Sequence, residues 1–238
     1  MTAEPQHEQL LAQELAHADS PQDRVAAVCR VAMRILDAAG VAVSLSIDET
    51  SGGPVIATDG ATHDRENLQL DLGEGPCHLA VVLGEAVQVP DVGADDARWS
   101  AWSAAAQRLG VGSVLALPLG TSTARLGSLS VYRDTPGALE PRDRAWALAL
   151  ARVASRGVVE MVEDGFDDTS GAMLRHRHEV HQAQGMVMAQ LEVDATDALA
   201  RLRAHAWLHD RSLVELARDV VTRTVRLGRD DPGSDSRR

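Results

Sequence analysis

Apolar and polar positions follow two different periods along the first two thirds of the chain, and these periods predict its elements. Apolar residues spaced three and four apart predict amphipathic helices over residues 4–18 and 21–39. Stretches in which apolar and polar residues alternate follow, bounded by Gly, Pro and Asp, and they predict strands. These strands cover residues 41–47, 86–89, 113–119 and 125–132. A long helix over residues 141–162 closes this part, so we expect an α+β fold with an antiparallel sheet.

The last third of the chain changes to purely helical patterning. Apolar residues recur every three or four positions over 180–187 and 198–206, which is typical of helices with one buried face. Asp194 and Ser212 stand where a side-chain oxygen caps a helix start, and a glutamate follows Ser212 by three positions, the spacing of a capping box. The pattern predicts three short helices between residues 173 and 221, packed as a small bundle.

Gly185 lies inside the first helix of this predicted bundle. A glycine in a helix interior is less favourable than alanine by about 1 kcal/mol. We therefore expect Gly185 to have a packing role, namely to let a neighbouring helix approach closely.

Three sequence blocks with fixed spacing lie in the same region. The first runs from Arg177 through Gln182-Ala183-Gln184-Gly185 to Met188, the second covers residues 198–206 and the third residues 213–221. Together they resemble the ANTAR domain, a three-helix RNA-binding module of bacterial antitermination regulators. Many members carry Lys between the Ala and Gly of the first block. This chain has Gln184, which keeps hydrogen bonding and removes a charge. The resemblance implies RNA contacts from this bundle, with candidate residues Arg177, Gln184, Arg203, His205 and Arg211.

Charge is divided unevenly along the 238 residues, whose formal net charge is −12. Between residues 173 and 229, nine Arg stand against seven acidic residues, and five of the nine His lie there too. A mild, local basic surface favours recognition of a specific RNA shape over nonspecific coating of a duplex. The planar guanidinium of Arg suits phosphates and base edges. An alternative stays open for Arg203 and Arg211, which can instead pair with Asp197, Asp210 or Asp219.

A second set of blocks lies upstream. It consists of Leu72-Gly-Glu-Gly-Pro-Cys77, Val89-Pro-Asp91, Arg98-Trp99 and residues 113–119 and 126–132. These blocks resemble the GAF domain over roughly residues 21–163. The resemblance implies a sensor for a small-molecule ligand that the sequence does not identify, and the cofactor is likewise unknown. Candidate ligand-pocket residues are Cys77, Trp99 and Trp102, with core packing as the plain alternative.

Both resemblances together indicate a GAF–ANTAR transcription antitermination regulator of the actinobacterial type. The expected architecture is α+β: a GAF-like antiparallel sheet flanked by helices, followed by an all-α three-helix ANTAR bundle. The expected parts are an N-terminal helix (1–20), the sensor (21–163), an acidic linker (164–171), the ANTAR domain (172–228) and a disordered tail (229–238). The apolar stripes of residues 142–162 and 173–191 favour a homodimer through the helices around the junction.

The two cysteines, Cys29 and Cys77, provide no disulfide framework, which favours a reducing cytosol. No apolar run has membrane length, and residues 1–20 carry acids and amides where a signal peptide needs a basic and then an apolar start. We expect a cytoplasmic protein without a membrane partner.

Histidine pairs offer no convincing metal site in the sequence. His178-Glu-Val-His181 resembles the zinc-protease motif, but its histidines are three apart instead of four. His205 and His209 do have a spacing of four, yet no third ligand stands at an evident spacing. We therefore expect no metal and no catalytic residue.

Two functions from different classes remain open. In the first, a non-enzymatic GAF sensor controls an ANTAR module that binds a hairpin element in a nascent leader RNA, so that RNA polymerase, engaged indirectly, reads through a terminator. In the second, the GAF domain is a Cys-dependent redox enzyme or redox sensor, and the helical tail only dimerises. Cys77 would be the nucleophile, although side chains adjacent in sequence, such as Cys77 and His78, usually point apart.

Overall fold

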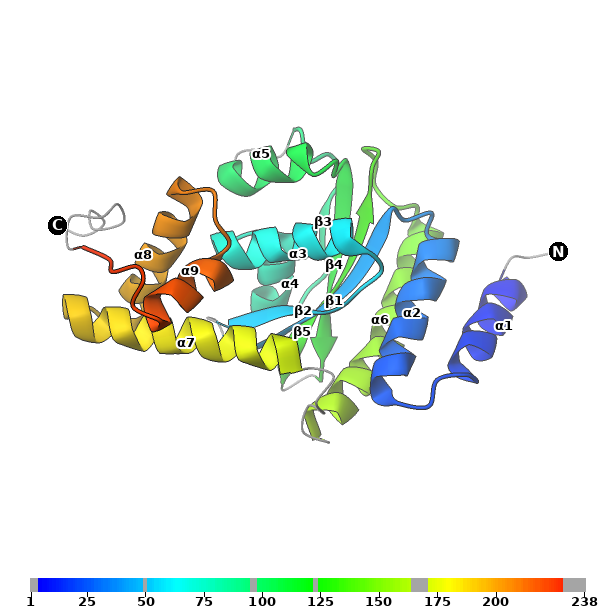
Figure 1. The fold of residues 1–238 in the computed structure, drawn as a ribbon. Coiled ribbons are helices and arrows are strands. Elements are labelled where there is room, and N and C mark those ends of the chain that lie inside the picture. Colours follow the sequence, from blue (N-terminus) through cyan, green and yellow to red (C-terminus); the bar gives the residue numbers. More distant parts are fainter. Residues whose placement is uncertain (1–3, 49–50, 95–97, 122–123, 164–170, 229–238) are drawn as a thin grey trace.

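The computed structural model describes residues 4–48, 51–94, 98–121, 124–163 and 171–228. Within these residues, five strands form one antiparallel sheet with helices on both faces, and three further helices lie at one side (Figure 1). The strands are β1 (Gly40–Asp48), β2 (Ser51–Ala57), β3 (Val87–Val89), β4 (Ser113–Gly120) and β5 (Arg125–Arg133). Their order across the sheet is β2-β1-β5-β4-β3.

Helices cover the two faces of the sheet unequally. On one face lie α2 (Pro21–Ile35) and α6 (Pro141–Glu163), with α1 (Glu4–Leu15) packed outside α2 (Figure 1). The other face carries α3 (Gly60–Leu72), α4 (Pro76–Leu83) and α5 (Ser100–Arg108). The remaining helices are α7 (Gly171–Leu191), α8 (Ala195–Leu208) and α9 (Leu213–Val221).

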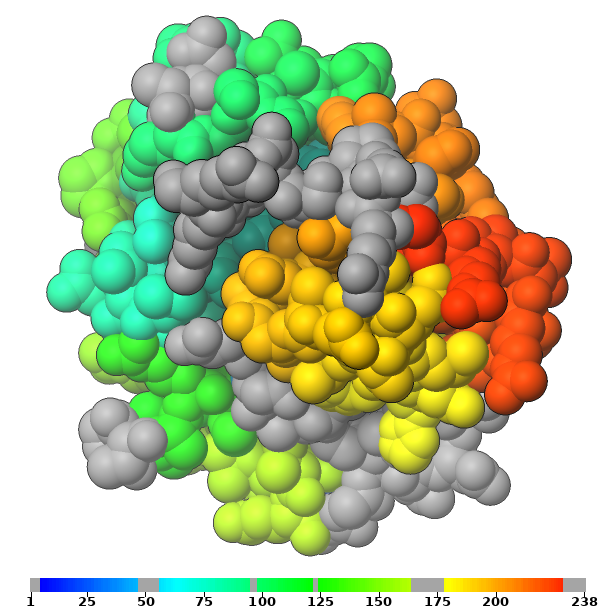
Figure 2. Space-filling view, turned by 90° about the vertical axis from the view of Figure 1, so that its left-hand side faces the viewer, coloured from blue at the N-terminus to red at the C-terminus, as the bar shows by residue number. Residues whose placement is uncertain are grey.

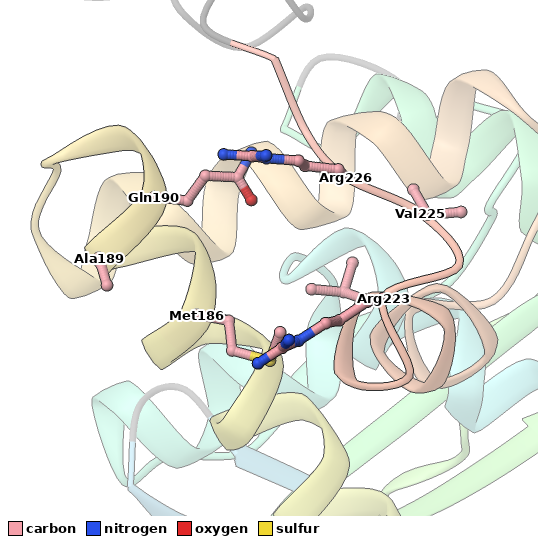
Figure 3. A pocket seen from close by; sticks show the side chains of 7 residues that line it. Met186, Ala189, Gln190, Arg223, Val225 and Arg226 are labelled. Atoms are coloured by element: carbon pink, nitrogen blue, oxygen red, sulfur yellow. The ribbon is translucent and has the colours of Figure 1, made fainter.

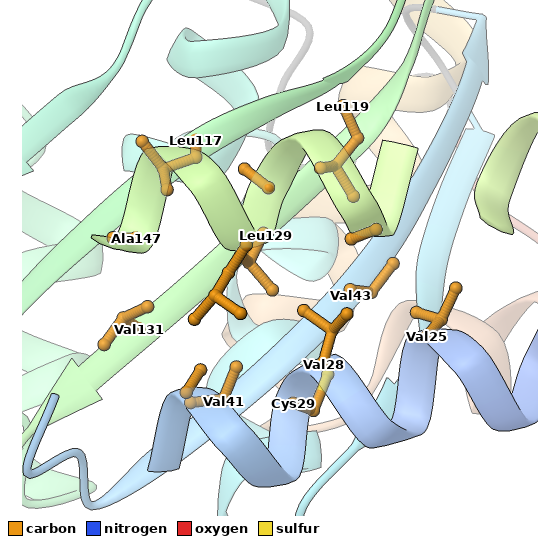
Figure 4. Close-up of a cluster of buried hydrophobic side chains, with 14 of the residues drawn as sticks. Val25, Val28, Cys29, Val41, Val43, Leu117, Leu119, Leu129, Val131 and Ala147 are labelled. Atoms are coloured by element: carbon orange, nitrogen blue, oxygen red, sulfur yellow. The ribbon is translucent and has the colours of Figure 1, made fainter. Parts of the chain in front are cut away.

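Alternation along the central strands assigns neighbouring residues to different cores. In β5, Leu129 and Val131 face α2 and α6, where they join Val28 and Leu150 in an apolar cluster (Figure 4). Tyr132, the residue after Val131, belongs instead to the cluster under α4 and α5. This period of two is the pattern from which the strands were predicted.

Gly157 on α6 marks a close contact between two helices. A Cβ at this position would lie 2.7 Å from Val25 Cγ2 on α2 and 3.3 Å from the Pro21 carbonyl oxygen. The absence of a side chain at Gly157 therefore lets α2 and α6 pack directly against each other over the sheet.

The sequence pattern predicted α1, α2, β1, β3, β4, β5 and α6, and it missed β2, α3, α4 and α5. The reason is clearest for α3, whose inner face is polar and buries Thr62, Arg65, Glu66 and Gln69. Such a helix has no apolar stripe. The predicted second helix was also too long, since α2 ends at Ile35 and Asp37 adopts a left-handed φ of 47°.

The three C-terminal helices form the predicted bundle around their own core. That core contains Val180, Val187, Leu202, Leu213, Leu216 and Val220. Both predicted caps are present: the Asp194 carboxylate accepts from the Asp197 N–H at 2.8 Å, and Ser212 begins α9 with a capping box.

The expectation for Gly185 was wrong. Gly185 is exposed on α7, and apart from its chain neighbours and the backbone of the same helix no described atom lies within 4 Å of the position that its Cβ would occupy. The buried face of α7 is formed by Val180, Ala183 and Val187 instead.

The bundle packs directly on the sheet domain. Helix α7 runs along the edge strand β2, and α8 lies beside α3 (Figure 1). In the space-filling view, the yellow-to-red residues of the bundle lie against the cyan and green residues of the sheet domain (Figure 2). In the parts of the chain that the structure describes, no helix combines the length and apolarity needed to cross a membrane.

Candidate functional site

A polar cluster is buried between α3 and the sheet. The Glu66 carboxylate accepts hydrogen bonds from Tyr132 Oη at 2.7 Å and from Ser44 Oγ. The Gln69 amide donates to both Tyr132 Oη and Cys77 Sγ at 2.8 Å, and its oxygen accepts from the Cys77 N–H at 2.8 Å. The cluster thus ties α3, the first turn of α4, β1 and β5 together.

Cys77 lies inside this cluster and not at a surface. Its Sγ is 2.8 Å from Ser130 Oγ and 3.6 Å from Glu66 Oε1. Burial raises the pKa of the Cys77 thiol above its usual range, and the negative charge of Glu66 raises it further. A redox nucleophile requires the thiolate, which this environment disfavours.

The three ligand-pocket candidates lie in one apolar cluster. Trp99 and Trp102 make an edge-to-face contact with ring centroids 5.7 Å apart, and both belong with Cys77 to the core beneath α4 and α5. The backbone N–H of Trp102, near the start of α5, donates to the Glu74 carboxylate at 3.1 Å. The structure therefore brings these candidates together as packed side chains.

Sequence reasoning did not identify Glu66, Gln69, Tyr132 or Ser130 as members of this site. Two signals were present. Tyr132 is the only tyrosine of the chain, and it follows Val131 on a strand whose alternation turns it to the opposite face. Glu66 and Gln69 stand three apart, on one face of a helix that the apolar pattern did not reveal.

Arg203 on α8 faces the sheet domain and not solvent. Its guanidinium lies over Gly73, which ends α3 in a left-handed conformation with φ 68°. Burial lowers the pKa of Arg203, while the nearby Asp71 carboxylate acts in the opposite direction. Asp71 also accepts a hydrogen bond from the Leu213 N–H at 2.8 Å.

Asp71, near the end of α3, has an unusually high pKa for a carboxylate. Burial raises its pKa from 3.8 to about 6, although the Leu213 N–H and Arg203 both lower it. The neighbouring Glu215 carboxylate raises it further. Asp71 is therefore partly desolvated by the contact between the sheet domain and the bundle.

The other RNA-binding candidates are dispersed. Gln184 is buried and donates to the Ala195 carbonyl at 2.7 Å, which joins α7 to the start of α8. Arg211 pairs with Asp219 at 2.7 Å, one of the three aspartates named as its possible partners from the sequence. His205 stacks on His209 with ring centroids 4.2 Å apart. Arg177 lies in α7, and its side chain is outside the described part of the structure.

A cleft of about 200 Å³ lies where α3 meets the turn between α8 and α9. Leu68 and Asp71 line it from the sheet domain, and Trp207, Asp210 and Arg211 line it from the bundle. Arg203 and Arg211 are thus both close to the contact between the two parts of the chain.

Among the described residues, no group of three or more His, Cys, Asp or Glu side chains is placed to hold a metal ion. His178 is exposed on α7, and Nδ1 of His209 lies 2.8 Å from the His205 carbonyl oxygen. In the described residues, these positions do not bring the two histidine pairs together as ligands of one metal ion.

A groove of about 570 Å³ lies on the bundle (Figure 3), and none of the candidate RNA-binding residues lines it. It is bounded by the C-terminal half of α7 and by the chain that follows α9. Its lining consists of Met186, Ala189, Gln190, Val220, Arg223, Val225 and Arg226. None of these residues was singled out from the sequence.

Comparisons with solved structures agree with the sheet topology. The GAF domain of the Acinetobacter phosphoenolpyruvate-protein phosphotransferase superimposes with a TM-score of 0.55 at 12% identity, covering 69% of this chain and 98% of that chain. The corresponding GAF domain from Coxiella burnetii gives 0.55 at 15% identity, covering 67% and 95%. At such identities the likeness concerns the fold alone. No curated protein matches the chain.

Sequence families account for both parts of the molecule. The GAF domain family matches residues 18–159, which are more than half of the chain and contain the sheet with its helices. The ANTAR domain family matches residues 171–221, which form α7 to α9. Both are regulatory domains. The chain therefore belongs to the GAF domain family and carries a C-terminal ANTAR domain, the arrangement of a sensor-controlled RNA-binding regulator.

Proposed function

We propose that this protein is a cytoplasmic transcription antitermination regulator. Its ANTAR domain binds a paired-hairpin element in a nascent leader RNA and disfavours the terminator, so that RNA polymerase reads through. The polymerase is affected through the transcript and not by direct contact. The ANTAR match over α7 to α9 and the local basic charge of this region support the proposal.

The position of Arg203 is the observation that supports control of RNA binding by the sensor domain. We assign this side chain to RNA, yet it lies against Gly73 and near Asp71 of the sensor. A phosphate and Asp71 compete for the same guanidinium, so RNA contact by Arg203 and the docked arrangement exclude each other. We infer that the docked form is the form with low RNA affinity.

Helix α3 connects the sensor core to this contact. Gln69 belongs to the buried polar cluster, and Asp71, two residues later, contacts the bundle. A small polar ligand that exchanged hydrogen bonds with Gln69 would shift the end of α3. Such a shift would change how tightly the sensor holds α8 and α9.

A pair of variants in the full chain tests this function. Arg203→Ala should weaken binding of a leader hairpin RNA by removing a contact worth roughly 1 to 3 kcal/mol. Asp71→Ala should strengthen it, because the Leu213 N–H loses its acceptor and the sensor then holds the bundle less tightly. Arg108→Ala, an exposed position on α5, is the control and should leave the affinity unchanged. Failure of the parent protein to bind any leader hairpin, measured by titration and by sequencing of co-purified RNA, would refute the function.

We also propose that the protein is a homodimer. The basis is the pair of apolar-striped helices on either side of the domain junction, residues 142–162 and 173–191, and Leu148 on the first of them is 40% exposed. Light scattering at tens of micromolar, on the order of weak-dimer dissociation constants, should give twice the mass of the chain. The mass of a single chain would contradict this assignment.

A further inference from the structure

We propose that the groove on the ANTAR domain is a nucleotide-binding subsite. It would take an unpaired base of the RNA together with the phosphates beside it. We call it the C-terminal groove, with the seven lining residues Met186, Ala189, Gln190, Val220, Arg223, Val225 and Arg226. This inference rests on the proposed function, and it adds a place of contact outside the residues that the sequence suggested.

The wall of the groove is a fixed part of the fold. After α9 the chain reverses at Arg223, which has a left-handed φ of 61°. The N–H of Val225 donates to the Asp219 carbonyl at 3.2 Å, and the Gln190 side chain donates to the Leu227 carbonyl. Leu227 itself is buried in the core of the bundle. The segment from 223 to 227 is therefore held against α7 by hydrogen bonds and apolar packing.

The lining has the chemistry of a nucleotide site. Met186, Val220 and Val225 provide an apolar floor on which the face of a base can lie. Arg223 extends from the reversed segment toward Met186, and Arg226 extends toward Gln190 (Figure 3). Guanidinium groups bind phosphates and stack on bases, and an amide such as that of Gln190 reads base edges. The volume of about 570 Å³ lies within the usual range of ligand sites, roughly 300 to 1,000 Å³.

The positive charge of its lining favours a nucleotide over other occupants of the C-terminal groove. No lining residue is acidic, and neither Arg223 nor Arg226 pairs with a carboxylate of a described residue. By contrast, Arg211 pairs with Asp219 and Arg218 pairs with Glu179. Two exposed guanidinium groups over an apolar floor fit a nucleotide better than the apolar face of another protein.

The C-terminal groove remains open in the docked arrangement. It is lined by residues near the C-terminal end of α7, the end that projects beyond the sheet in Figure 1. The Arg203 guanidinium, by contrast, lies against Gly73 at the end of α3. Arg223, Val225 and Arg226 also lie after residue 221, where the ANTAR match ends. The subsite is thus completed by an extension of the matched domain and is available before the sensor releases Arg203.

The test compares two charge-matched double variants of the full chain. Arg223→Ala with Arg226→Ala removes the proposed contacts, and Arg108→Ala with Arg142→Ala removes two exposed arginines of the sensor. Each is titrated with a leader hairpin RNA and with the same hairpin carrying abasic nucleotides in its loop. Circular-dichroism melts establish that all the proteins are folded.

We expect the groove variant to bind the intact hairpin at least tenfold more weakly than the control. The slope of the logarithm of its binding constant against the logarithm of salt concentration should become shallower by about 1.5, the value for two lost phosphate contacts. Abasic nucleotides in the loop should lower the affinity of the control for the hairpin. They should leave the affinity of the groove variant nearly unchanged, because that variant has already lost the site for the base. Ala189→Glu, an exposed substitution in the groove, should reproduce the loss by repelling phosphate.

Equal affinity of groove variant and control overturns the subsite while the proposed function stands, since the parent still binds the hairpin. Absence of RNA binding by the parent refutes the proposed function first. A fall in mass of the groove variant by light scattering, with RNA affinity unchanged, would instead identify the groove as a contact between copies of the chain and would equally overturn the subsite.

Discussion

The Asp71 carboxylate accepts a hydrogen bond from the backbone N–H of Leu213 at 2.8 Å, and this bond joins the sensor to the ANTAR domain. Leu213 is the first residue of α9, where backbone N–H groups have no partner within the helix. Ser212 and Glu215 satisfy other groups at the same helix start through their capping box. The start of α9 is therefore capped by side chains of both domains, and its environment changes when they separate.

The first prediction concerns pH. Burial raises the pKa of Asp71 to about 6 in the docked form, against an ordinary value of 3.8. Between these values the docked form binds more protons than the open form, so docking strengthens as pH falls through this window and is weakest above about 6. From pH 7 to pH 5 the docking equilibrium should rise about tenfold.

Energy transfer between dyes on Arg108→Cys and Thr196→Cys, two exposed positions in the two domains, measures this change. Asp71→Asn is the matched control, since it keeps an oxygen for the Leu213 N–H and cannot titrate. It should show a flat response over the same range. A response equal to that of the parent would assign the pH dependence to other groups.

The second prediction concerns Gly73. Alanine at a left-handed position is unfavourable by about 1 kcal/mol, and its Cβ would also collide with the Arg203 guanidinium. Gly110, with φ 72°, gives a matched control because a Cβ there would lie 3.7 Å from Arg65, an ordinary contact. Both alanine variants should lose similar stability in thermal melts. Gly73→Ala should in addition bind RNA more tightly, and unchanged RNA affinity in that variant would argue against occlusion of Arg203.

The third prediction concerns thiol reactivity. Burial raises the pKa of Cys29 to about 12, and it raises that of Cys77 as well. Neither thiol should react with a thiol reagent in the native protein at about pH 8, because the thiolate is the reactive form. Both should react once the protein is unfolded, as mass spectrometry will show. Rapid native labelling at Cys77, as fast as at a cysteine placed at exposed position 108, would revive the redox alternative.

The fourth prediction contrasts two helical glycines. Gly185→Ala should raise stability by up to about 1 kcal/mol, since the site is open and alanine is the better helix former. Gly157→Ala should lower it by about 1 to 3 kcal/mol, since the new Cβ meets Val25 and the two helices must move apart. Denaturant titrations of both variants measure the difference. Loss of stability in Gly185→Ala would restore the packing role that the sequence suggested.

The sequence alone determined the elements whose side chains repeat with the period of their own backbone. Helix α2 presents Val25, Val28 and Ala32 on one face, and β4 alternates between two cores, so local spacing was sufficient to predict both. Ser212 and Glu215 fixed the start of α9 in the same way, because a capping box is a contact across three residues. The family blocks added the order of the two domains.

Only the tertiary structure decided which polar side chains are partners. Gln69 meets Tyr132, 63 positions away, and Asp71 meets Leu213, 142 positions away. Neither pair leaves a periodic mark in the sequence, because its hydrogen bonds are satisfied by distant elements and not by near neighbours. The same holds for Arg203, whose charge is visible in the sequence while its direction, toward the sensor, is set by how α8 packs beside α3.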